Sequence, residues 1–283
     1  MRHGRHWFSK AGLWFGLAFL YVPIVSMIVF SFNNSRLVTV WDAPNSPTLR
    51  WYGELFRNEQ ILGAAWLSIR IAAMSATGAV VLGTLAGLVL ARFGPFRGRA
   101  LLSGMTTAPL VMPEVITGLS LLLLFVSLEQ LIGWPAMRDA ATITIAHMTF
   151  SMAYVTIVVQ SRLAGFDNSL EEAALDLGAR PAKVFFRITL PLIVPAIMSG
   201  WLLAFTLSWD DVVVSQFVAG PGSTTLPMVI FSKVRLGVSP DVNALATIMV
   251  LIVATGVVAS AFWMRRQERR REREMQMAAA ANK

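Results

Sequence analysis

The chain has 283 residues, of which 55% are hydrophobic and only 14% are charged. Soluble domains carry about 25% charged residues, so this composition excludes an ordinary soluble protein and predicts a chain that lies largely in lipid. Its length allows roughly six membrane-spanning helices of about 20 residues with their loops. The absence of cysteine excludes disulfides and thiolate metal sites, and the net charge of +8 favours a basic cytoplasmic side over nucleic-acid binding.

Stretches without charge predict six spans. They are 11–35, with its apolar part at 13–32, then 71–91 extended back to about 61, about 100–128, 140–161, 188–209 and 242–264. Each is long enough to cross about 30 Å of hydrocarbon. The first could instead be a signal peptide, but its apolar run is too long for one and no small-residue cleavage site follows Phe32. We therefore expect an uncleaved first span.

The first outer loop, residues 33–60, contains a short stretch rich in aromatic residues. Trp51, Tyr52, Leu55 and Phe56 share one face of a predicted short helix. Such residues suit the membrane–water interface. We expect this face to be an interfacial anchor with no substrate role.

Residues 212–232 are also uncharged, but Gly220-Pro221-Gly222 lies near their centre. A lipid-exposed helix does not place a turn signal there, because the freed backbone groups would find no water. We expect this stretch to be the end of the fifth span followed by an outer or re-entrant loop.

The basic residues predict the orientation of the spans. The N-terminus, the loops after the second and fourth spans, and the tail hold 17 of the 24 Lys and Arg residues, while the other loops hold 6 and Arg70 lies within the second span. Short basic loops remain in the cytoplasm. We therefore expect both termini to be cytoplasmic, as an even number of spans requires.

The loop at 162–187 predicts two short helices. Ser169 and Glu172 fit a capping box, so a helix should run to Leu177. Gly178 favours a left-handed end to that helix, and Pro181 favours the first turn of a second one. We expect a structured, charged projection into the cytoplasm.

This loop contains a set of residues at fixed separations, namely Glu172, Ala173, Ala174, Gly178, Ile188, Leu190 and Pro191. These residues and their spacing resemble the EAA motif of ABC-type importer permeases, with every spacing met. The resemblance implies that the loop forms coupling helices that dock in a cleft of a separate ATPase. The alternative is an ordinary pair of amphipathic loop helices.

The residue types of the motif suit a mechanical joint. Glu171 and Glu172 offer carboxylates to basic groups of a partner, Ala173 and Ala174 allow close approach, and Gly178 permits a sharp bend. The chain has no phosphate-binding Gly-x-x-x-x-Gly-Lys-Ser/Thr motif. ATP should therefore be bound by another polypeptide, and we expect this chain to be non-catalytic, with no cofactor.

Three acids in or at the predicted spans are candidates for a solute path. Charge inside a membrane is costly and usually functional, and Glu114, Asp210 and Asp211 would attract a cation in the outer half. Alternatively, Glu114 follows Pro113 and stabilises the first turn of a restarted helix, and the aspartate pair caps a break. Because adjacent residues point apart, we expect only one aspartate to face the path.

Aromatic residues accompany these acids. Trp201, Phe205 and Trp209 recur every four residues before the aspartates, and ring faces can hold a cation, although facing lipid or packing is the more ordinary role. His147 and Tyr154 lie seven residues apart, on one face of the fourth span. We place Phe205, Trp209 and Tyr154 among the candidate path residues and expect His147 to be a hydrogen-bonded packing residue.

Further stretches resemble the permeases of polyamine importers, above all those for putrescine. They are Ser31-Phe32-Asn33, Trp51-Tyr52, the run from Ala108 to Gly118, the run from Leu207 to Asp211, and Thr225-Leu226-Pro227. Glu114 stands where those permeases carry an aspartate, so the acid is kept with a longer reach. The similarity covers nearly the whole chain.

This resemblance implies an all-α fold of the type I ABC importer permease class in the bacterial inner membrane. It implies a cytoplasmic segment at 1–10, a membrane domain at 11–264 and a basic cytoplasmic tail at 265–283. The implied partners are membrane lipid, two copies of an ATP-binding cassette ATPase, a second homologous permease and a periplasmic polyamine-binding protein, without nucleic acid.

Three other functions remain open from the residues. The chain could be a permease for spermidine, another cationic solute, or an anion or iron complex, although the acids disfavour an anion. It could be a secondary transporter, although no internal repeat is evident. A membrane enzyme is the least favoured, because no nucleophile–base pair or His–acid cluster is evident.

Overall fold

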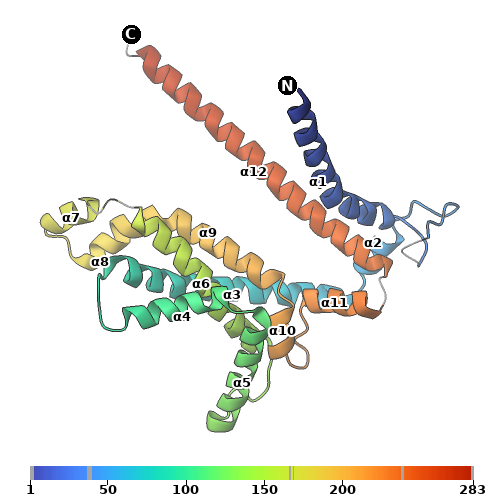
Figure 1. Ribbon diagram of the computed structural model, residues 1–283, viewed down its shortest axis with the longest axis horizontal. Coiled ribbons are helices and arrows are strands. Elements are labelled where there is room, and N and C mark those ends of the chain that lie inside the picture. Colours follow the sequence, from blue (N-terminus) through green and yellow to red (C-terminus); the bar gives the residue numbers. More distant parts are fainter. Residues whose placement is uncertain (1–2, 37–39, 166, 168, 237–238, 282–283) are drawn as a thin grey trace. The chain divides into compact units, whose positions relative to one another are not determined.

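The computed structural model describes residues 3–36, 40–165, 167, 169–236 and 239–281. Throughout these residues the secondary structure is helical, and no strand occurs in them (Figure 1). The chain forms two compact units. One consists of residues 1–59 with 233–283, and the other of residues 60–232.

The helices are, in chain order, α1 (His3–Phe30), α2 (Arg50–Leu55), α3 (Glu59–Arg92), α4 (Arg99–Val111), α5 (Glu114–Ile132), α6 (Ala140–Ala164), α7 (Ser169–Asp176), α8 (Pro181–Val184), the π-helical turn η1 (Phe185–Thr189), α9 (Leu190–Trp209), α10 (Val213–Val218), α11 (Leu226–Leu236) and α12 (Pro240–Ala281). Within the described ranges, six helical segments are long and apolar enough to cross a membrane, which confirms the expected number of spans.

The third span differs from its prediction as one continuous helix. It is broken between α4 and α5, where Met112 and Pro113 adopt extended ψ angles of 135° and 136°. Proline lacks an N–H and disfavours a helical conformation in the residue before it. A new helix starts at Glu114, as the alternative interpretation expected, so a depth counted along one continuous helix does not apply to this residue.

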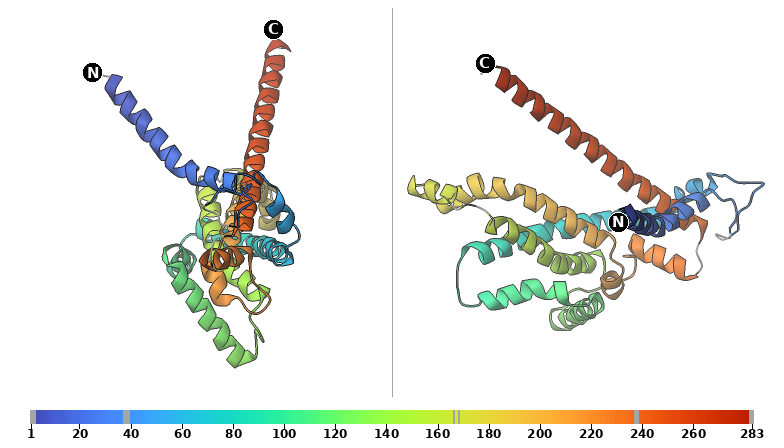
Figure 2. Two further views of the ribbon diagram at one scale, coloured as in Figure 1. Left: turned by 90° about the vertical axis from the view of Figure 1, so that its right-hand side faces the viewer. Right: turned by 45° about the horizontal axis from the view of Figure 1, so that its top comes forward.

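The unit of residues 60–232 is packed around α6, which runs beside α9 and α4 (Figures 1 and 2). Small residues let α3 approach it closely. A Cβ on Gly83 would lie 2.7 Å from the Cβ of Val155, and one on Gly87 would lie 3.1 Å from the carbonyl oxygen of Thr156. Close backbone approach is a common way for helices to associate in lipid, where the hydrophobic effect between them is weak.

Two clusters of buried apolar side chains fill this unit. One joins α3, α5, α6 and α10 through Ile71, Phe125, Ile143 and Val214, and the other joins α3, α6 and α9 around Val155. The stretch after the fifth span therefore forms α10, which is packed into protein, and then α11. At the end of α10, the carbonyl oxygen of Val218 accepts the hydroxyl of Thr142, and the N–H of Gly220 donates to the hydroxyl oxygen of Ser223.

The other unit contains α1, α2 and α12. Trp51 is only 5% exposed and donates its indole N–H to the carbonyl oxygen of Asn33 at 2.6 Å, and Leu55 is buried. The expectation that these residues anchor the chain at the membrane interface is therefore wrong for Trp51 and Leu55, while Phe56 is exposed. A helix of six residues is unstable alone, so its apolar face packs against protein, including α12.

Candidate functional site

A cavity of about 490 Å³ lies where several helices of the 60–232 unit begin or end. It is bordered by the α4–α5 break, by α6, and by the residues between α9 and α10. Its lining includes Glu114, Thr117, Tyr154, Asp210 and Asp211. The structure thus brings three predicted acids and Tyr154 to one cavity, together with Phe150, which the sequence analysis did not single out.

Glu114 enters this cavity from the start of α5. It is the first residue of the helix, after Pro113 as its N-cap, and it is exposed. The unpaired N–H groups and the dipole of a helix N-terminus favour a carboxylate there. The start of α5 is therefore a favourable position for an acidic side chain.

The two adjacent aspartates lie in different environments. The side chain of Asp211 is only 5% exposed, and both of its carboxylate oxygens accept hydrogen bonds. One accepts from the backbone N–H of Val214 at 3.2 Å, and the other from that of Ser215 at 2.7 Å. Asp211 therefore caps the start of α10, whereas Asp210 is exposed at the cavity.

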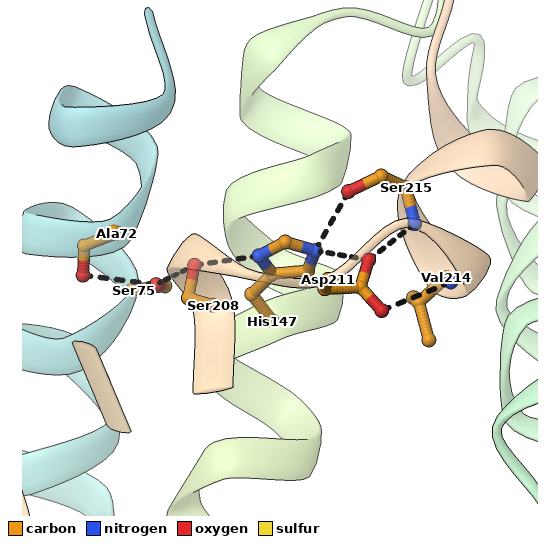
Figure 3. A network of polar contacts seen from close by, with 7 residues as sticks. All are labelled: Ala72, Ser75, His147, Ser208, Asp211, Val214 and Ser215. Carbon is orange, nitrogen blue, oxygen red and sulfur yellow. Dashed lines mark hydrogen bonds and ion pairs between the residues drawn. The ribbon is translucent and has the colours of Figure 1, made fainter. Parts of the chain in front are cut away.

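A buried histidine completes the surroundings of Asp211 (Figure 3). Nε2 of His147 lies 3.1 Å from Oδ2 of Asp211, and Nδ1 lies 2.6 Å from the hydroxyl oxygen of Ser208. Because a carboxylate only accepts, Nε2 donates to Asp211, and in the neutral ring Nδ1 accepts from Ser208. Ser208 also bonds to Ser75, so the network joins α3, α6, α9 and the start of α10.

His147 is thus a hydrogen-bonded packing residue, as the sequence predicted. Its acid partner was not predicted. The partner lies 64 residues further along the chain, and no pattern within the fourth span points to it. The sequence shows a histidine within one apolar span and, separately, two aspartates at the end of another. Only the fold brings His147 and Asp211 together.

The aromatic residues before the aspartates lie outside the cavity lining. Trp201, Phe205 and Trp209 form a stacked ladder with ring centroids 5.3 and 6.2 Å apart. Trp201 donates its indole N–H to Thr77 at 3.1 Å, and Trp201 and Phe205 pack on the cluster around Val155. Their spacing of four keeps them on one face of α9, whereas Asp210 follows the end of that helix.

A second candidate site is the segment of residues 169–189, which contains α7, α8 and η1 and which we call the arm. α7 begins at Ser169, and the carboxylate of Asp167 accepts the backbone N–H of Ser169 at 3.0 Å. This hydrogen bond lowers the pKa of Asp167. The prediction of Ser169 as the N-cap is therefore wrong, because Ser169 is already inside the helix and its N–H is satisfied by Asp167.

The bend of the arm agrees with its sequence signals. α7 ends at Asp176, and Gly178 has a φ of +81°. The N–H of Ala179 bonds to the carbonyl oxygen of Ala174 at 3.0 Å, which closes the turn. Pro181 then opens α8 at its first turn. A groove of about 340 Å³ lies along the bend, beside Lys183 and Arg187.

The two adjacent glutamates of the arm point differently. Glu172 is exposed, as is Ala173. Glu171 is 18% exposed, and its Oε1 accepts the hydroxyl of Thr189 at 2.6 Å and lies 3.4 Å from a guanidinium nitrogen of Arg92. The structure therefore turns Glu171 inward, although the sequence analysis assigned both glutamates to a partner surface.

The sequence has clear relatives. The profile of the family described as "Binding-protein-dependent transport system inner membrane component" matches residues 79–273. The putrescine transport system permease protein PotI of Escherichia coli strain K12 is 57% identical over 265 residues, which cover 93% of this chain and 92% of PotI. The spermidine/putrescine transport system permease protein PotC of the same strain is 43% identical over 244 residues, 86% of this chain and 88% of PotC.

The fold also has solved counterparts. A chain of a bacterial ABC transporter involved in the import of the acidic polysaccharide alginate matches with a TM-score of 0.69 and 16% identity, covering 92% of this chain and 98% of that one. A chain of the MetNI methionine ABC transporter matches with a TM-score of 0.53 and 16% identity, covering 71% of this chain and 92% of that one. These likenesses confirm the all-helical type I ABC importer permease fold that the resemblance implied.

Proposed function

This chain belongs to the family of binding-protein-dependent transport system inner membrane components, and we propose that it is a non-catalytic permease subunit of an ATP-driven polyamine importer, with putrescine as its substrate. The relatives named for putrescine and for spermidine with putrescine support this substrate class. The observation that carries the proposal is the cavity at which the acidic side chains of Glu114 and Asp210 are exposed.

The cavity suits a small cation with two separated charges. Glu114 and Asp210 enter it from different elements, so two ammonium groups can each meet one carboxylate. Asp211 contributes less attraction, because its oxygens already accept two backbone N–H groups and pair with His147. Tyr154 and Phe150 add aromatic surface, on which an alkyl chain or an ammonium group can rest.

Spermidine is the second candidate substrate. The cavity of about 490 Å³ exceeds what a four-carbon diamine fills, which leaves room for a longer triamine. Uptake of labelled putrescine and spermidine, each in competition with the other, distinguishes the two. A lower KM for spermidine would reverse the assignment.

The arm is proposed as the docking surface for an ATPase. Glu172, Ala173 and Gly178 are exposed on it, and the groove beside Lys183 and Arg187 can receive a partner's side chains. The remaining proposed partners are a second homologous permease, a second ATPase copy and a periplasmic polyamine-binding protein. The matched alginate importer was solved in complex with its periplasmic protein, which supports an assembly of this kind.

The proposed location is the bacterial inner membrane, with the N-terminal segment 1–10, the arm and the tail 265–283 in the cytoplasm and the loop 33–60 outside. The natural chain has no cysteine, so a single cysteine can report on this topology. In whole cells, an impermeant maleimide should label Asn45→Cys and leave Met275→Cys unlabelled. The reverse pattern would contradict the proposed orientation.

The function is tested with the assembled complex in proteoliposomes that contain ATP on the side of the ATPase. We expect ATP-dependent accumulation of labelled putrescine, and none when the ATPase subunit is left out. Uphill accumulation by this chain alone would identify a secondary transporter instead. ATP-dependent uptake of an unrelated solute, without competition by putrescine, would overturn the substrate class.

A further inference from the structure

We propose that Glu171 is an internal tie that holds the arm to α3 and to the start of α9, and that it acts as the positioning residue through which movement of the arm reaches these helices. This inference rests on the proposed docking of an ATPase at the arm. It assigns different roles to two neighbouring glutamates: Glu172 faces the partner, and Glu171 faces this chain.

The geometry of Glu171 carries the proposal. Its Oε1 accepts the hydroxyl of Thr189 at 2.6 Å and lies 3.4 Å from a guanidinium nitrogen of Arg92. Thr189 is buried, and Glu171 and Arg92 each expose 18% of their side chains. One carboxylate thus joins three elements, namely α7, η1 and the end of α3.

The attachment is needed because α7 has little else to hold it. The helix has eight residues and no buried side chain, and helices this short do not persist in isolation. On its C-terminal side is the bend at Gly178, where φ is +81°. Without a tie across that bend, a push on α7 would be absorbed by rotation at the bend and would not reach α9.

The far end of the tie lies at a change in helix type. Thr189 is the last residue of η1, and α9 continues from Leu190 without interruption. Single π-helical turns interrupt the regular hydrogen-bond ladder and often occur at functional sites. A force applied through the hydroxyl of Thr189 therefore acts at the base of a membrane-spanning helix that ends at Trp209, next to Asp210 and the cavity.

The alternative is that Glu171 binds the ATPase, as its neighbour is proposed to do. Its carboxylate is largely covered and already meets two donors. To bind a partner it would have to leave the hydroxyl of Thr189 and the charge of Arg92. Hydrogen bonds to charged groups are among the stronger ones in proteins, so the inward position is the one that the contacts favour.

The test compares Thr189→Val with Thr189→Ser in the assembled complex. Valine keeps the shape of threonine and removes the hydroxyl, whereas serine keeps the hydroxyl. Putrescine uptake and ATP hydrolysis are measured in the same proteoliposomes, and the amount of ATPase that copurifies is measured beforehand. We expect Thr189→Val to retain the ATPase and its hydrolysis while uptake per ATP falls about tenfold, as loss of a hydrogen bond to a charged group predicts. Thr189→Ser should match the natural protein.

Glu172→Gln is the control for docking. It should lower the amount of ATPase that copurifies, which Thr189→Val should leave unchanged. Unchanged uptake per ATP in Thr189→Val would overturn the proposal. Loss of the ATPase from Thr189→Val to the extent seen in Glu172→Gln would also overturn it, because the tie would then act only by shaping the docking surface.

A second measurement keeps the proposal separate from the transport function. Because the natural chain has no cysteine, Asp176→Cys and Arg97→Cys, both at exposed positions, can carry a pair of spin labels in the full chain in lipid nanodiscs. The distance distribution between the labels should broaden with Thr189→Val and remain narrow with Thr189→Ser. Equal widths in the two variants would contradict the tie. A complex that transports no putrescine would refute the proposed function and leave this measurement valid.

Discussion

The cavity and the arm each contain a pair of adjacent acids, and in both pairs one acid is turned inward. At the cavity the inward acid, Asp211, is held by two backbone N–H groups and a buried histidine. In the arm the inward acid, Glu171, is held by side chains from two other elements. Backbone capping fixes where a helix starts, whereas side-chain contacts join elements that can move apart. In the proposed function, the first pair shapes the cavity, and the second links the arm to α3 and α9.

The largest effect, a loss of stability, should come from replacing Asp211, the aspartate that accepts two backbone N–H groups. Asp211→Ala leaves the N–H groups of Val214 and Ser215 and the ring of His147 without their acceptor. Removing one partner of a buried pair costs about 3 kcal/mol or more. We expect this loss in the free energy of unfolding, measured by denaturation of the full chain in detergent. The free energy of unfolding of Asp210→Ala should be close to that of the natural protein. An equal loss in both variants would contradict the difference between the two aspartates.

The bend of the arm is the next most sensitive position. Gly178→Asp places a side chain at a φ of +81° and beside the proposed docking groove. Strain of one to three kcal/mol is usual for such residues, so we expect ATP-dependent uptake to fall about twentyfold while membrane insertion is retained. Gly222→Asp has a similar φ of +76° outside the arm and serves as the control. Normal uptake in Gly178→Asp would count against coupling through the arm.

The exposed acids of the cavity should affect affinity more than turnover. Asp210→Asn and Glu114→Gln each remove one charge that a diamine can meet, and we expect the KM for putrescine to rise about tenfold in each. Initial rates of uptake over a range of putrescine concentrations measure this. Glu129→Gln is the matched control, because Glu129 is exposed on the same helix α5 and does not border the cavity. A fall in the maximal rate at constant KM would place these acids outside the substrate path.

The smallest effect is expected from the aromatic ladder. Phe205→Leu removes a ring that stacks between Trp201 and Trp209 outside the cavity lining. Aromatic pairs contribute about 1 kcal/mol beyond their buried area, so we expect a slightly lower unfolding midpoint and an unchanged KM for putrescine. A raised KM for putrescine would indicate that the aromatic ladder contributes to the substrate path. Phe56→Leu, at an exposed ring, is the control for stability.

The features of the two candidate sites that depend on neighbouring residues in the sequence could be predicted. The bend at Gly178 and the start of α8 at Pro181 follow from backbone preferences, and the helix restart at Glu114 was foreseen as an alternative because it follows Pro113. The capping of α7 was mispredicted, because Asp167 and Ser169 both suit a helix start and the pattern does not choose between them. Nothing in the sequence indicated the roles of Thr189 and Arg92, because threonine and arginine are common at helix ends.

The six apolar segments, their interruptions and the spacing of the motif in the arm could all be recognised in the amino-acid sequence. Hydropathy and the backbone preferences of glycine and proline act within a few residues, so they can be read along the chain. Which acid of each pair faces inward depends on how the helices pack. The distant side-chain partners of these acids lie 18 residues away at Thr189, 64 at His147 and 79 at Arg92, and helix packing is needed to bring such side chains together.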